Sequence, residues 1–198
     1  MLNIPYASVV GCLQYLQICT RPDISFITGM LGRFQSNPHK PHWRAAKQVL
    51  RYFKKANALR LTFSNLGTFE MIGFSDADFA GDPNDNKSTS AYVFTLSRTP
   101  ISWRSTKEKK TTTLTMQAEF LEIYEASNHA LFLRNFVTEL GLINLVQKPI
   151  TLFCDNSVTI CFIKNNNTSA TSKHYELRHY AVLKEVEAGR IVVKYKNT

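Results

Sequence analysis

The spacing of apolar and polar residues predicts helices throughout the first third of the chain. Apolar residues recur at helical intervals from Val9 to Ile18, and the sequence Thr20-Arg21-Pro22-Asp23 then stops one helix and starts the next. A second helical stretch runs from Ile24 to Phe34, and a third helix is predicted from about Pro41 to Lys55. We therefore expect a small helical segment over residues 1–60.

Beyond Asn57 the pattern changes to short runs rich in aromatic and branched residues, which are typical of strands. The extended runs are Leu59–Phe63, Phe69–Asp76, Ala91–Leu96, Ile101–Arg104, Ile150–Cys154 and Ile191–Tyr195. Helices are predicted from about Thr115 to Leu140 (closed by Gly141), over Ser157–Lys164, and from about His174 to Ala188 (closed by Gly189). From Phe69 onward the order is β-β-β-α-β-α-α-β, which indicates an α/β domain over residues 61–198.

The net charge of +9 is concentrated at one end of the chain. Residues 1–60 hold nine Lys and Arg against one acid, Asp23, whereas residues 61–198 hold fifteen against fourteen. A charge distribution as uneven as this is typical of proteins that bind a polyanion, although a basic helix exposed to solvent produces the same pattern. One face of the third predicted helix could follow a phosphate backbone. This basic ridge consists of Arg44, Lys47, Arg51, Lys54 and Lys55.

The composition indicates an ordered intracellular protein. Of its 198 residues 44% are hydrophobic, a fraction too high for a disordered chain. No apolar run approaches the roughly 18 residues of a membrane span, and the N-terminus lacks the basic region of a secretory signal. We therefore expect no membrane partner and a location in the cytoplasm, the nucleus or both. The spacing of the four cysteines contains no CxxC motif and favours buried thiols in a reducing compartment.

Three acids fall where the ends of strands and an adjoining helix can bring them together. Asp76 lies at the end of the first strong strand, Glu119 in the first turns of the long helix, and Asp155 directly after the strand Ile150–Cys154. Taken singly, Asp76 can be explained as a turn former, Glu119 as a favourable charge at a helix N-terminus and Asp155 as a helix cap. Together they favour a metal site, because clustered carboxylates repel one another unless a divalent cation neutralises them.

Mg²⁺, or Mn²⁺ in its place, is the natural occupant of such a carboxylate site. Two such ions about 4 Å apart can activate water and stabilise the leaving oxygen in phosphodiester hydrolysis. Asp78 lies on the same strand face as Asp76 and is the likelier helper, with Asp82 as an alternative. Simple solvated loop acids remain the competing interpretation for both.

A series of ordered motifs resembles the C-terminal part of a copia-type LTR retrotransposon polyprotein. The motifs are SVVGCLQYL, TRPDISF, HWRAAKQVLRYFK, FSDADFAGD, KSTSAYVF, ISWRSTK, QAEF, CDN and SKHYELRHY. In that family the first third closes the reverse transcriptase and the remainder is a ribonuclease H domain. The resemblance implies a ribonuclease H-like mixed five-stranded sheet with flanking helices. It also implies that Asp76, Glu119 and Asp155 are metal-binding catalytic carboxylates, and that the RNA strand of an RNA–DNA hybrid is cleaved.

The chain departs from the family pattern at three places. Ala91 stands where a glycine usually precedes the strand, and Gln117 replaces an acid two residues before the helix glutamate. Family members also continue into a final helix and an Ala-Asp pair that supplies a fourth carboxylate, whereas the printed sequence stops at Thr198. The second hypothesis is accordingly a host-adopted, catalytically weak or inactive module that binds nucleic acid or a protein partner, such as a reverse transcriptase or a host protein.

Four further residues are candidates for contact with nucleic acid. Ser88, Thr89 and Ser90 could donate hydrogen bonds to phosphates or 2′-hydroxyls, and ordinary polarity at the entry to a strand is the competing interpretation. Arg178, on the penultimate predicted element, could contact a phosphate or simply be exposed to solvent.

Overall fold

The chain divides into two compact units. The computed structural model describes residues 4–56, 58–63, 70–78, 87–108, 115–142, 147–164 and 173–197, with the side chains of 173–175 left aside. The first unit contains Met1–Phe63 together with the short segment Arg104–Thr106, and the second contains Ser64–Trp103 and Lys107–Thr198. The functional division inferred from the resemblance, with the end of a reverse transcriptase followed by ribonuclease H, stays a prediction.

The first unit is helical, as predicted. Its elements are α1 (Tyr6–Cys19), the 3₁₀ turn η1 (Pro22–Ile24), α2 (Ser25–Gly32) and α3 (Lys40–Lys55). The stretch predicted as one helix from Ile24 to Phe34 therefore consists of η1, opened by Pro22, followed by a shorter α2. Its core is formed by Tyr6, Val10, Leu13, Ile24, Leu31, Ala46 and Val49.

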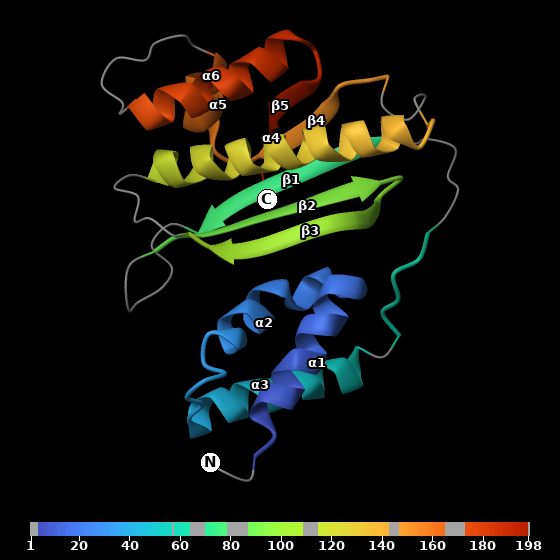
Figure 1. Cartoon of the computed structure of the whole chain (residues 1–198), viewed down its shortest axis with the longest axis vertical. Helices are drawn as coiled ribbons and strands as arrows, with labels where there is room; N and C mark the ends of the chain where they lie inside the picture. The colour runs from blue at the N-terminus through green and yellow to red at the C-terminus, as the bar shows by residue number, and fades with distance from the viewer. Residues whose placement is uncertain are drawn as a thin grey trace. The chain divides into compact units, whose positions relative to one another are not determined.

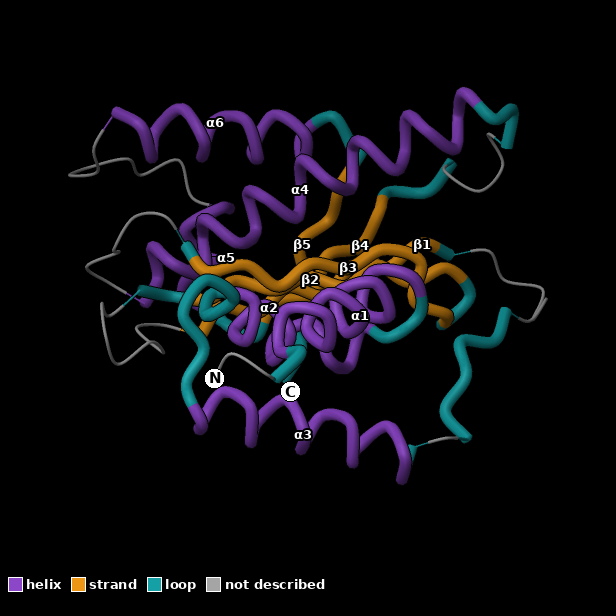
Figure 2. Tube along the Cα trace, turned by 60° about the horizontal axis from the view of Figure 1, so that its bottom comes forward, coloured by secondary structure: helices purple, strands orange, loops and turns teal. Residues whose placement is uncertain are grey.

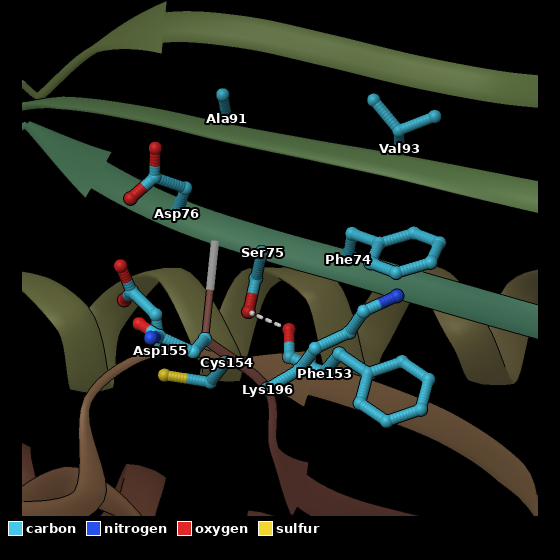
Figure 3. Close-up of a pocket in the computed structure, with 10 residues that line it drawn as sticks. Phe74, Ser75, Asp76, Ala91, Val93, Phe153, Cys154, Asp155 and Lys196 are labelled. Carbon is cyan, nitrogen blue, oxygen red and sulfur yellow. Dashed lines mark hydrogen bonds between the residues drawn. The ribbon is translucent and has the colours of Figure 1, made fainter.

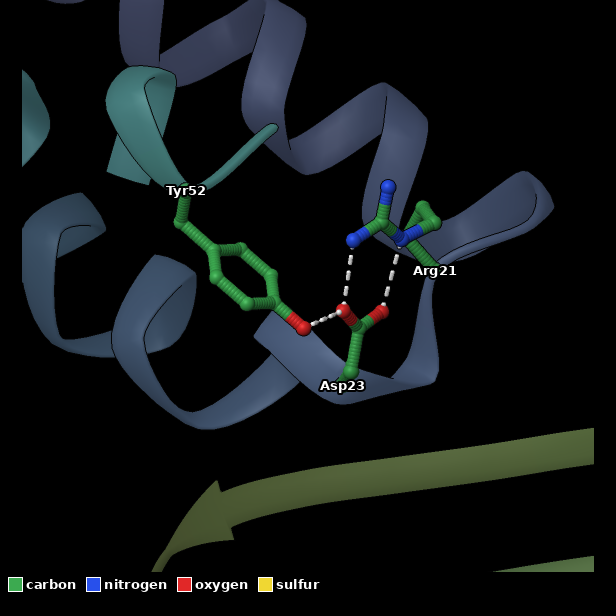
Figure 4. Close-up of polar contacts among 3 residues, drawn as sticks. All are labelled: Arg21, Asp23 and Tyr52. Carbon is green, nitrogen blue, oxygen red and sulfur yellow. Dashed lines mark hydrogen bonds and ion pairs between the residues drawn. The ribbon is translucent and has the colours of Figure 1, made fainter. Parts of the chain in front are cut away.

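A polar cluster joins η1 to α3 within this unit (Figure 4). Arg21 donates two hydrogen bonds to the Asp23 carboxylate, at 2.8 and 2.7 Å, and the Tyr52 hydroxyl donates a third at 2.8 Å. The guanidinium also lies 4.4 Å from the centroid of the Phe53 ring. The hydrogen bond from Arg21 is the main reason why the pKa of Asp23 is lowered, with Tyr52 contributing in the same direction.

The second unit is built on a mixed five-stranded sheet, which confirms the fold predicted from the sequence. Its strands are β1 (Met71–Asp78), β2 (Thr89–Leu96), β3 (Thr99–Lys107), β4 (Ile150–Cys154) and β5 (Ile191–Tyr195), arranged in the order β3-β2-β1-β4-β5. β1 is antiparallel to β2 and parallel to β4, and β4 is parallel to β5. The run Leu59–Phe63 forms no strand, because an extended run needs a hydrogen-bonded neighbour and the ladders among the described residues involve only β1–β5.

Three helices pack against one face of this sheet (Figures 1 and 2). They are α4 (Thr115–Glu139), α5 (Ser157–Lys164) and α6 (Lys173–Glu187). Alternate residues of β1 are buried toward them, and the intervening residues, from Ile72 to Asp78, lie on the other face. Gly73 is needed in the buried row, because a Cβ there would overlap Leu152 and lie 2.7 Å from the Phe94 ring.

Positive φ angles mark the turns of this unit. Gly141 and Gly189 follow α4 and α6 with φ of 76° and 67°, as expected for glycines that close helices. The turn between β2 and β3 places Ser97 and Arg98 at φ of 49° and 67°, the left-handed conformation that a two-residue hairpin of the primed type requires.

The helices and the cysteines bear on the expected surface of the protein. No helix among the described residues has the length and apolarity needed to cross a membrane. The expectation of buried thiols is wrong for three of the four cysteines: Cys154 is buried, but Cys12, Cys19 and Cys161 are exposed. Their apolar sequence neighbours made a buried position appear favourable, but these three sulfurs lie on helix faces that the described structure leaves uncovered.

Candidate functional site

The three predicted carboxylates lie near one another at one end of the sheet. Asp76 is near the end of β1, and Asp155 follows the end of β4, its parallel neighbour. Glu119 points in from the second turn of α4 with 6% of its surface exposed. Asp155 is not the cap of α5, because Asn156 Oδ1 accepts the capping hydrogen bond from the Thr159 N–H at 3.0 Å.

Burial and neighbouring charges raise the pKa of two of the carboxyl groups, Glu119 and Asp76. Burial, followed by the charges of Asp155 and Asp76, raises the pKa of Glu119 from 4.5 to about 7. Partial desolvation and the charges of Asp155 and Asp78 raise the pKa of Asp76. Ionising these carboxyl groups is therefore unfavourable without a counterion, and a bound cation would make it more favourable. Asp78 itself lies exposed at the end of β1.

Cys154 is a fourth group in the site, and sequence reasoning missed it. Its Sγ lies 3.9 Å from Glu119 Oε2 and accepts a hydrogen bond from the Asn156 N–H at 3.3 Å. The ligand atoms of Glu119, Cys154 and Asp155 all lie within 4.8 Å of one another. Desolvation raises the pKa of the thiol to about 12. The available signal was its position next to Asp155 in the CDN motif, at an inward-facing place on β4.

A pocket of about 300 Å³ opens beside the carboxylates (Figure 3). Asp76 and Asp155 lie at one end of it, and Phe74, Phe153 and Lys196 at the other. The two phenyl rings are stacked with centroids 5.5 Å apart, and the Lys196 ammonium lies 4.9 and 5.2 Å from them. The pocket therefore combines acidic, aromatic and cationic groups on the face of the sheet opposite α4.

The substituted family positions lie at the edge of this arrangement. Ala91 pairs with Asp76 across the β1–β2 ladder and lines the pocket, so its methyl group occupies space that a glycine would leave open. Gln117 is half-buried in the first turn of α4, two residues before Glu119.

The residues predicted to contact nucleic acid do not form one group. Ser88, Thr89 and Ser90 are buried, with exposed fractions of 0%, 8% and 7%, and the Ser90 hydroxyl donates a hydrogen bond to Glu108 at 2.5 Å. Their burial weighs against direct contact with a polymer, and their role stays a prediction. The guanidinium of Arg178 lies 5.2 Å from the centroid of the Tyr124 ring, on α4.

The basic ridge belongs to the first unit. Arg44, Arg51, Lys54 and Lys55 are exposed on α3, and Lys47 is half-buried with its ammonium 5.9 Å from the Trp43 ring. Arg44, Lys47 and Arg51 line a shallow depression together with Gln48. The ridge exists as a surface feature, and its binding of nucleic acid stays a prediction.

The strand order, the three helices on one face and the acids at the ends of β1 and β4 define a ribonuclease H-like domain. The fold is shared with the foamy viral protease-reverse transcriptase, whose structure was determined in complex with dsDNA. That match has a TM-score of 0.63 at 15% identity and covers 100% of this chain and 40% of that one.

By sequence, the chain belongs to the retrovirus-related Pol polyproteins of transposons, as the motif series predicts. It is 37% identical over 187 residues to the polyprotein from transposon TNT 1-94 of Nicotiana tabacum, and this match covers 94% of the chain but 14% of the polyprotein. It is also 41% identical over 133 residues to Secreted RxLR effector protein 161 of Plasmopara viticola, covering 67% of the chain and 94% of that protein. No family model matches the chain.

Proposed function

We propose that the chain carries a ribonuclease H activity that cleaves the RNA strand of RNA–DNA hybrids by metal-dependent phosphodiester hydrolysis. The observation that supports the proposal is the position of Asp76 near the end of β1 and of Asp155 directly after its parallel neighbour β4, with the buried Glu119 close enough to feel the charge of both. Membership in a family of Pol polyproteins supports it, because reverse transcription produces such hybrids.

The donors present fit hard divalent cations. Carboxylate oxygens are the ligands that Mg²⁺ and Mn²⁺ prefer, and a bound cation would offset the burial and the neighbouring charges that raise the pKa of Asp76 and of Glu119. Asp76, Glu119 and Asp155 would hold the ions, with Asp78 as a further candidate. Two bound ions would supply a water of lowered pKa and charge neutralisation at the leaving oxygen.

The residues themselves have separable tasks in this proposal. Asp76 and Asp155 border the pocket, where a phosphodiester can approach. Glu119 is buried beneath them, which holds its carboxylate in place and excludes water from one side of the site. The buried Cys154 thiol keeps its proton at neutral pH, so it does not serve as a nucleophile in this proposal.

A labelled RNA–DNA hybrid tests the activity directly. With Mg²⁺ present we expect products from the RNA strand, and we expect Asp76→Asn to abolish them. Glu139→Gln, which changes an exposed acid at the end of α4, serves as the matched control and should cleave like the wild type. Cleavage that survives Asp76→Asn would show that another site, or a contaminating nuclease, produced it.

The basic ridge supplies a second experiment within the same proposal. If α3 contacts the phosphate backbone, Lys47→Gln and Arg51→Gln should each weaken hybrid binding and reduce the slope of log K against log salt by about 1 per lost phosphate contact. Gln48→Ala, in the same depression, removes no charge and should leave that slope unchanged. An unchanged slope in both charge variants would exclude the ridge from binding.

A module that binds nucleic acid or a protein without cleaving is the second candidate function. The likeness to a protein named as a secreted effector, covered over 94% of its length at 41% identity, favours it. The two candidates differ in their response to Mg²⁺. A working site should be stabilised by millimolar Mg²⁺ through mass-action linkage, whereas a binding module should bind the hybrid equally well with Asp76→Asn and show no thermal shift.

A further inference from the structure

Three donors of unequal chemical hardness meet at the carboxylate end of the pocket, two of them in its lining. They come from α4, from the last residue of β4 and from the residue that follows it: Glu119, Cys154 and Asp155. Their ligand atoms all lie within 4.8 Å of one another, and Glu119 Oε2 lies 3.9 Å from Cys154 Sγ. Asp76 lies outside this tight group, so the group differs from the carboxylate set proposed for hydrolysis.

The Glu119 carboxylate has few protein donors for a group so deeply buried. Only 6% of its surface is exposed, and among the described residues its hydrogen-bond donor is the Cys154 thiol, at a distance of 3.9 Å. A carboxylate offers about four acceptor sites, and buried ones are normally satisfied by donors or by a metal ion. The single long contact with the Cys154 thiol therefore leaves the Glu119 carboxylate with acceptor capacity that a metal ion could use.

The spacing of sulfur and oxygen suits a small tetrahedral ion. With a Zn–S distance of about 2.3 Å and a Zn–O distance of about 2.1 Å, tetrahedral ligands lie roughly 3.6 Å apart. The observed 3.9 Å between Cys154 Sγ and Glu119 Oε2 needs only a slight closure. The Asn156 N–H, 3.3 Å from the sulfur, would remain as a donor to the thiolate. Mg²⁺ uses oxygen ligands and gains little from sulfur.

We propose that Glu119, Cys154 and Asp155 form a binding site for Zn²⁺ and for softer divalent ions such as Cd²⁺, in which the thiolate is the selective ligand. As the sulfur–metal bond forms, the thiol proton passes to solvent and no electron is transferred. An ion held there occupies two of the carboxylates assigned to Mg²⁺, so it inhibits hydrolysis. That last consequence rests on the proposed function, whereas the binding itself does not.

Cd²⁺ bound by thiolate absorbs in the ultraviolet, which makes it a direct probe of the sulfur. A full-length variant with serine at Cys12, Cys19 and Cys161 leaves Cys154 as the single thiol. We expect Cd²⁺ to produce the thiolate charge-transfer band in this variant with one ion per chain. The matched control keeps the exposed Cys161 and carries serine at the other three positions, and it should show no saturable band. Near-ultraviolet circular dichroism establishes that both variants are folded.

Two further substitutions test the other ligands. Glu119→Gln and Asp155→Asn should each weaken Cd²⁺ binding by at least about tenfold, the usual loss when a metal site is damaged. Adding Mg²⁺ should lower the apparent Cd²⁺ affinity, because the ions share two carboxylates. A band that is absent from the Cys154-only variant, or unaffected by both acid substitutions, overturns the inference.

The outcomes separate this inference from the proposed function. A Cd²⁺ band at Cys154 in a protein that cleaves no hybrid refutes the ribonuclease and leaves the soft-ion site. Cleavage that depends on Mg²⁺ and Asp76, in a protein without a band at Cys154, refutes the soft-ion site and leaves the ribonuclease. If Zn²⁺ binds as proposed, it should also inhibit cleavage by the wild type more strongly than cleavage by Cys154→Ser.

Discussion

Replacing Glu119 with glutamine should stabilise the metal-free protein at alkaline pH, although it removes a residue of the candidate active site. The carboxylate is buried beside two other acids, and its pKa is raised from 4.5 to about 7. The folded state therefore holds its proton more tightly than the unfolded state. Ionising this group costs stability, and a neutral amide of the same shape avoids that cost.

The sign and size of the effect follow from linkage. Below pH 4.5 both states are protonated and the carboxyl group carries no penalty. As the pH rises from 4.5 through 7 the unfolded state ionises first, so stability is lost across that interval and then levels off. A shift of the Glu119 pKa from 4.5 to about 7 lowers the free energy of unfolding by about 3 kcal/mol at pH 8. At pH 5 it lowers the free energy of unfolding by about 1 kcal/mol.

Urea unfolding in the presence of a chelator measures this difference. We expect Glu119→Gln to exceed the wild type in unfolding free energy by up to about 3 kcal/mol at pH 8 and by about 1 kcal/mol at pH 5. Glu139→Gln, on the exposed end of the same helix, should show no such dependence on pH. Mg²⁺ should stabilise the wild type and have less effect on Glu119→Gln. An equal loss of stability at both pH values would refute the reasoning.

Two substitutions away from the carboxylates test the packing and the polar cluster. Gly73→Ala should lower the unfolding free energy by about 1–3 kcal/mol in urea, because its methyl group overlaps Leu152. Gly11→Ala, on an exposed face of α1 with open space around it, should be neutral or stabilise by up to about 1 kcal/mol. Tyr52→Phe should raise the pKa of Asp23, followed by carboxyl NMR, since it removes a hydrogen bond to the ionised form. The stability that ionised Asp23 contributes should then be lost at a higher pH on acidification.

Elements whose ends carry strong local signals could be predicted from the sequence to the residue. The strand Ile150–Cys154, the helix Ser157–Lys164 and the strand Ile191–Tyr195 have the predicted bounds. Each is short, and polar residues, proline or glycine delimit it sharply. The pattern was less informative for α1, where Val10 and Leu13 are buried but Leu16 and Ile18 are exposed. Apolar spacing identifies a helix, but the contacts of its neighbours decide which apolar residues are covered.

The candidate site could be predicted only in part for a related reason. Asp76 lies near the end of β1 and Asp155 directly follows β4, and the ends of neighbouring parallel strands meet at one edge, so their convergence follows from topology. The place of Cys154 depends on a separation of 3.9 Å from a helix that is distant in sequence. Periodicity assigns the thiol to the inner face of β4, but it contains no information about which side chain the thiol meets there.

The position of β1 in the middle of the sheet has a consequence during synthesis on the ribosome. β1, β2 and β3 form a local antiparallel meander that can pair as soon as Lys107 has emerged, whereas β4, the other neighbour of β1, begins only at Ile150. At a translation rate of about 5–20 residues per second, β1 remains an open edge for several seconds. Unpaired edges are templates for association with other chains. Nascent chains on neighbouring ribosomes of one messenger RNA can therefore associate through this edge in the interval before Asp155 is synthesised and the candidate site can form.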